Sequence, residues 1–137
     1  MKPAILYRVA AALLLLFGAG HTLGFSQVDP GWHVDTLVGS MRSVRFDMMG
    51  AQRGYWDLFL GLGYSLTPLY LFSALLAWQL GGLDGNALAR LRLTRWAFAL
   101  AYAAILAVSA VWLFIVPIVF SGLIALCLIA AALRTPA

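Results

Sequence analysis

Two ionisable side chains, His21 and Asp57, lie inside long apolar stretches, each about one helical turn from an end of its stretch. Ionisable groups at membrane depth are costly, and they mark binding sites, proton paths or buried pairs. Arg53 precedes Asp57 by four residues, a spacing that places both side chains on one helix face. The topology predicts a His21–Asp57–Arg53 cluster. It would serve either to lock two helices together or to bind a ligand or handle protons.

Tyr64 lies on the same helix face as Asp57, together with Gly61 and Pro68. This face is compatible with plain helix packing, as is the Gly20-x-x-x-Gly24 spacing in the preceding apolar stretch. It is also compatible with a narrow ligand pocket. The predicted ligand-binding or polar cluster therefore comprises His21, Arg53, Asp57 and Tyr64.

Metal and cofactor sites are weaker hypotheses. Thioethers and imidazoles suit copper(I), and the candidate ligands in the segment after the first apolar stretch are His33, Met41, Met48 and Met49. Their spacing matches no compact motif. A haem held by His21 and His33 is an alternative, although the chain has no C-x-x-C-H motif. A quinone would need only an apolar pocket with a few polar contacts.

No catalytic set can be assembled from this sequence. It contains five acidic residues, and it has no H-E-x-x-H, P-loop or dinucleotide-binding pattern. Its single cysteine, Cys127, lies in an apolar stretch and is expected to act as small packing. We therefore expect a non-enzymatic protein.

The polar residues are set among four apolar stretches that cover most of the chain. Hydrophobic residues make up 64% and charged residues 10%, and the mean hydropathy is +0.94. This composition excludes an ordinary soluble domain. Each stretch is long enough to cross a bilayer. The sequence predicts one all-α domain over residues 1–137, a four-helix transmembrane bundle with spans at about 4–25, 55–78, 93–113 and 116–133.

The distribution of basic residues predicts the orientation. If both termini are cytoplasmic, the inner loops and span ends carry six basic residues against one acidic residue, a net charge of +5. The outer side then carries three basic residues against four acidic ones, a net charge of −1. Lys and Arg favour the cytoplasmic side, so we expect cytoplasmic termini in a bacterial inner membrane. Arg90, Arg92 and Arg95 are expected to extend toward lipid headgroups, and no nucleic-acid partner is expected.

The connecting segments carry their own signals. Asp29-Pro30-Gly31 predicts a turn. Apolar residues then recur at helical spacing, which predicts a short amphipathic external helix; the stripe is Val34, Leu37, Val38, Met41, Val44 and Met48. Asp84 or Asn86 is expected to cap the third span, and Pro117 to lie in the first turn of the fourth. The first apolar stretch is expected to be a retained signal anchor.

The run Arg53-Gly54-Tyr55-Trp56-Asp57-Leu58-Phe59-Leu60-Gly61-Leu62-Gly63 resembles the R-S-Y-W-D-F-Y-x-G-F-G motif of a bacterial family of four-helix membrane proteins. Gly20-His21-Thr22, Met41-Arg42-Ser43-Val44 and Trp78-Gln79-Leu80 extend the resemblance along the chain. Gly54 stands where the family usually has serine. The size and four-span plan are also distantly similar to those of DoxX-like proteins. The resemblance implies no activity, but it implies a family signature that includes His21, Arg53, Tyr55, Trp56 and Asp57.

These observations lead to one main functional expectation and one alternative. The main expectation is a membrane protein that binds a lipid- or quinone-type ligand or serves as an accessory subunit of a membrane complex. The alternative is a DoxX-like redox partner, or a protein that handles haem or copper. The expected partners are membrane lipids, a second copy of the chain or another membrane protein. A transporter built as an oligomer is a third possibility.

Overall fold

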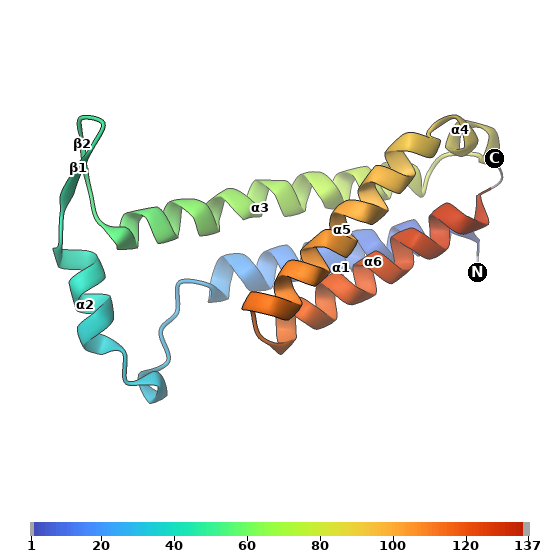
Figure 1. Cartoon of the computed structure of the whole chain (residues 1–137). Helices are drawn as coiled ribbons and strands as arrows, with labels where there is room; N and C mark the ends of the chain where they lie inside the picture. Colours follow the sequence, from blue (N-terminus) through green and yellow to red (C-terminus); the bar gives the residue numbers. More distant parts are fainter. Residues whose placement is uncertain (1, 136–137) are drawn as a thin grey trace. The chain divides into compact units, whose positions relative to one another are not determined.

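A computed structural model describes residues 2–135, and most of these residues are helical (Figure 1). The long helices are α1 (Pro3–Gly24), α3 (Tyr55–Leu80), α5 (Arg92–Trp112) and α6 (Ile115–Arg134). All four are long and apolar enough to cross a membrane. Their ends lie within two residues of the predicted spans. The chain therefore has the helices of a multi-pass membrane protein.

The described chain packs as two compact units. The first unit contains the residues up to Phe17 together with those from Tyr70 onward, and the second contains Gly18–Leu69. The prediction of one membrane domain over the whole chain stays a prediction.

Small residues at helical spacing build the core of the first unit. Ala10 and Ala11 of α1, Ala74 and Ala77 of α3, and Ala99 of α5 are all buried. Because alanine side chains are short, helix backbones can approach closely at these positions. Larger apolar side chains fill the spaces between them; they include Leu14, Phe17, Tyr70, Ile124 and Leu128.

Helices α5 and α6 lie side by side in the first unit (Figure 1). Two extended residues, Leu113 and Phe114, connect them. Pro117 is the third residue of α6, where the missing N–H has no helical partner to lose. The predicted tight connection, with Pro117 in the first turn of the last helix, is confirmed.

The first loop of the second unit begins with the predicted turn. Asp29 caps a short 3-10 helix, η1 (Pro30–Trp32), and its carboxylate accepts a hydrogen bond of 2.8 Å from the amide of Gly31. Helix α2 (Asp35–Ser43) follows, and none of its residues is buried.

The predicted amphipathic helix is wrong beyond Ser43. Strands β1 (Phe46–Met48) and β2 (Ala51–Arg53) form an antiparallel hairpin there, with Phe46 opposite Arg53 and Met48 opposite Ala51. Met49 and Gly50 form the turn with positive φ values of 53° and 87°. A two-residue turn of this kind suits glycine and matches the twist of a hairpin. This turn chemistry outweighs the helical spacing of Val44 and Met48.

A second correction concerns Asp84. Its carboxylate accepts a hydrogen bond of 2.8 Å from Ala87 N, and so it caps a separate short helix, α4 (Gly85–Arg90), rather than the third span. Leu91 interrupts the helix, and α5 begins at Arg92.

Candidate functional site

Asp57 lies in the first turn of α3, and its carboxylate contacts two residues that precede it in sequence, Gly54 and Arg45. Its Oδ2 accepts a hydrogen bond of 3.0 Å from the amide of Gly54 and forms an ion pair with the guanidinium of Arg45. A carboxylate three residues after the helix N-cap satisfies a backbone donor that would otherwise lack a helical partner. It also carries the charge that the positive end of the helix dipole favours. Asp57 therefore joins the hairpin segment to the start of α3.

Gly54 permits this arrangement because the backbone passes very close to the end of α2. A Cβ atom at this position would lie 2.9 Å from the carbonyl oxygen of Val44 and 3.0 Å from that of Met41. Backbone atoms cannot move aside cheaply, so a larger residue would push the chain away. The packing gives a physical reason for glycine at this position.

An open cavity of about 630 Å³ adjoins Asp57, lined by Arg45, Gln52, Arg53 and Asp57. The Arg53 guanidinium donates a hydrogen bond of 3.0 Å to the backbone carbonyl of Gln52. Arg53 and Asp57 line the same cavity, so they lie near each other as predicted. The predicted shared helix face is wrong, because Arg53 ends strand β2 and α3 begins only at Tyr55. Arg45 was not predicted, because it reaches Asp57 only through the hairpin. The Met49-Gly50 turn was the sequence signal for that hairpin.

His21 has a different set of neighbours in the second unit. Its Nε2 lies 2.9 Å from the carbonyl oxygen of Gly63. Its ring stacks on Phe25, with centroids 4.9 Å apart, and Phe25 meets the edge of Tyr64 at 4.7 Å. Gly63 is six residues after Asp57, about 9 Å further along the helix axis. The structure thus brings together His21 with Tyr64 through Phe25, and Arg53 with Asp57.

Close packing beside His21 uses Gly63 rather than the predicted Gly20 and Gly24. A Cβ on Gly63 would overlap the ring of Phe25, whereas Cβ atoms on Gly20 and Gly24 would meet nothing within 4 Å. A hydrogen bond of 2.8 Å between the hydroxyls of Thr22 and Thr67 joins the same two helical segments. The ends of α1 and α3 within this unit are therefore held by polar and aromatic contacts.

The weak metal candidates lie in four different local settings. His33 follows η1, Met41 lies in α2, Met48 ends β1, and Met49 is the fully exposed first residue of the hairpin turn. Within residues 2–135, no group of three or more His, Cys, Asp or Glu side chains could hold a metal ion.

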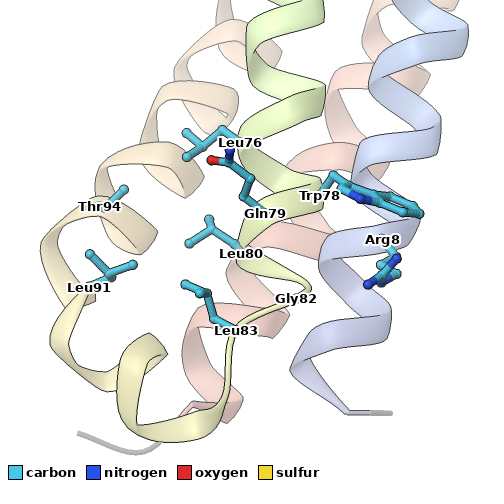
Figure 2. A pocket seen from close by; sticks show the side chains of 9 residues that line it. All are labelled: Arg8, Leu76, Trp78, Gln79, Leu80, Gly82, Leu83, Leu91 and Thr94. Atoms are coloured by element: carbon cyan, nitrogen blue, oxygen red, sulfur yellow. The ribbon is translucent and has the colours of Figure 1, made fainter.

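The first unit contains a second cavity, of about 530 Å³, near the C-terminal end of α3 and the N-terminal end of α5. Figure 2 shows Leu76, Gln79, Leu80 and Leu83 facing Leu91 and Thr94. Among these six residues, Gln79 and Thr94 are polar and the other four are leucines. We call it the leucine groove; its remaining lining residues are Arg8, Trp78 and Gly82.

Arg8 and Trp78 also line the leucine groove, and Figure 2 shows them on the side of α3 away from Leu91 and Thr94. The guanidinium carbon of Arg8 lies 4.0 Å from the centroid of the Trp78 ring, a cation–π contact (Figure 2). Tryptophan and arginine are typical of the level where lipid headgroups meet acyl chains. Sequence reasoning missed this groove because its lining comes from three helices and the intervening loop.

Arg95, expected to extend toward headgroups, is instead 2% exposed. Its NH1 group donates a hydrogen bond of 3.3 Å to the carbonyl of Ala132, near the C-terminal end of α6. Carbonyls at that end of a helix lack helical donors, and the dipole there favours a cation. Tyr7 is also fully buried, and its hydroxyl has no hydrogen-bond partner within the described part of the chain.

Neither a family model nor a curated protein nor a solved structure matches this chain.

Proposed function

We propose that this chain is a four-helix bundle of a bacterial inner membrane, with both termini cytoplasmic, that binds a phospholipid-like amphiphile in the leucine groove. The four long apolar helices support the membrane assignment. The excess of basic residues on the inner loops supports the orientation. The resemblance to bacterial four-helix membrane proteins supports the same plan.

The single observation that carries the ligand class is the lining of the leucine groove. Three leucines, Leu76, Leu83 and Leu91, offer an apolar surface to an acyl chain, whereas Leu80 of the same lining is only 2% exposed. The volume of about 530 Å³ lies within the range of small-molecule sites. Gln79 and Thr94 add a small number of polar contacts, which fix orientation in such sites.

Arg8 could bind the phosphate headgroup of the same amphiphile. Its guanidinium is exposed and is held against Trp78 at the edge of the groove. A guanidinium makes paired hydrogen bonds to phosphate oxygens. An amphiphile with a phosphate head and acyl chains would therefore satisfy both the charged and the apolar sides of the site.

Native mass spectrometry of the delipidated protein, titrated with phosphatidylglycerol, tests this function. Leu83→Gln introduces a polar group at a position that is 37% exposed, so it should weaken lipid retention without unfolding the bundle. Leu93→Gln is the matched control, because Leu93 is 84% exposed and does not line the groove.

We expect Leu83→Gln to lower retention several-fold and Leu93→Gln to leave it unchanged. Equal retention by both variants and the unmodified chain would contradict the assignment of the groove.

A further inference from the structure

The cavity beside Asp57 presents charges of both signs. Arg45 and Arg53 contribute guanidinium groups, Gln52 contributes an amide, and Asp57 contributes a carboxylate. Arg45 neutralises Asp57 in part through their ion pair, and the contacts of that carboxylate with Arg45 and with the amide of Gly54 both use Oδ2. Oδ1 is therefore able to accept a further hydrogen bond from a ligand donor.

Arg53 is available to an anion. Its hydrogen bond goes to a neutral backbone carbonyl, and the ion pair found among residues 2–135 is Arg45 with Asp57. The guanidinium thus keeps its full charge and most of its five donors. Gln52 is exposed next to it and can add a neutral donor.

The residues that line this cavity lie at the start of α3, which indicates how deep the cavity would lie in a membrane. Arg53 lies two residues before Tyr55, where the apolar helix α3 begins. Tyr55 and Trp56 open that helix, and such aromatic residues favour the membrane–water interface. Arg42 also lies over the Trp56 ring at 4.4 Å. If α3 spans a bilayer, as proposed above, the cavity lies at the level of the outer lipid headgroups.

We propose that this cavity recognises a phospholipid headgroup that carries a phosphate and a primary ammonium, as in phosphatidylethanolamine. Arg53 and Gln52 would bind the phosphate, and Asp57 would accept a hydrogen bond from the ammonium. The headgroup of phosphatidylglycerol could offer the carboxylate of Asp57 only neutral hydroxyl donors, which bind a carboxylate less strongly than an ammonium does. A quaternary ammonium has no N–H to donate. The inference rests on the proposed membrane placement of α3, and it is independent of the leucine groove.

The test compares lipids of identical acyl chains by native mass spectrometry of the delipidated full chain. The probes are phosphatidylethanolamine, phosphatidylcholine and phosphatidylglycerol. We expect phosphatidylethanolamine to be retained several-fold better than the other two. Because the leucine groove would hold one lipid in any case, the readout is the second bound lipid. Arg53→Gln should reduce the retention of a second phosphatidylethanolamine by roughly tenfold, because a charge-assisted hydrogen bond to phosphate is lost.

Asp57→Asn separates recognition from folding. The asparagine side chain can still accept a hydrogen bond from Gly54 N, so α3 should keep its N-terminus. Phospholipid should still bind, but the preference for the ethanolamine headgroup should disappear. Helical content by circular dichroism checks that the variant folds. Leu83→Gln should leave the headgroup preference intact, which distinguishes this site from the leucine groove.

Two results would overturn the proposal. One is equal retention of phosphatidylethanolamine and phosphatidylcholine by the unmodified chain. The other is tight, Asp57-dependent binding of soluble O-phosphoethanolamine in place of the lipid, which would assign the cavity to a soluble ligand.

Discussion

Asp57 and His21, which look like partners in the sequence, make separate contacts in the structure. Asp57 pairs with Arg45, and His21 binds the carbonyl of Gly63. A double-mutant cycle of Arg45→Ala and Asp57→Ala should therefore give a small but measurable coupling, as is typical of partly exposed ion pairs. The cycle of His21→Ala and Asp57→Ala should be additive, because the two side chains contact different groups. Thermal unfolding in detergent measures both, and strong coupling of His21 to Asp57 would restore the single-cluster hypothesis.

Gly63 and Gly61 are a matched pair of glycines in the same helix. Gly63→Ala should destabilise the second unit by about 1–3 kcal/mol, because the new methyl group would overlap the Phe25 ring. Gly61→Ala meets nothing within 4 Å and should be neutral or stabilising by up to about 1 kcal/mol. Chemical denaturation of both variants tests this. Equal effects would show that Phe25 does not occupy the space beside Gly63.

The hairpin is the element that brings Arg45 to Asp57. Gly50 has a φ of 87°, a conformation that an L-residue with a side chain adopts only with strain. Gly50→Ala should destabilise the hairpin by about 1 kcal/mol and speed hydrogen exchange across Phe46–Arg53. Gly39→Ala in α2 is the control, because its methyl group would meet nothing within 4 Å. Unchanged exchange in Gly50→Ala would exclude this role for the turn.

At the level of elements, apolar length was enough to predict α1, α3, α5 and α6, because a spanning helix needs only a long run without charges. Local turn and helix-start preferences were enough to predict the turn at Asp29 and the position of Pro117 in the first turn of α6. The hairpin was missed because Val44 and Met48 fit a helical stripe equally well, and only the turn residues favour strands. In the site, the proximity of Arg53 and Asp57 was predicted from their short separation in sequence, although Arg53 ends strand β2 and only Asp57 lies in helix α3. Arg45 and the leucine groove depend on contacts between elements, which spacing along one helix does not encode.

At the scale of the whole molecule, large apolar side chains remain on the outside of the helices. Leu16, Leu62 and Leu126 are 61%, 74% and 65% exposed. Contact with lipid tails leaves such apolar surfaces without a free-energy penalty, whereas contact with water is unfavourable.

A reporter fused after Ala137 should be active as a cytoplasmic reporter, because basic residues favour the inner side. A reporter placed at Gly39 should behave as periplasmic. The opposite pattern would reverse the proposed orientation.

Photo-crosslinking with a phospholipid that carries a diazirine at mid-chain tests lipid binding in the leucine groove most directly. The chain would be reconstituted in nanodiscs and labelled peptides mapped by mass spectrometry. We expect enriched labelling over residues 76–94, which include most of the residues that line the groove. Leu83→Gln should clearly reduce that enrichment, and Leu93→Gln should not. Labelling spread evenly over the exposed leucines of all four long helices, and unchanged by Leu83→Gln, would contradict it.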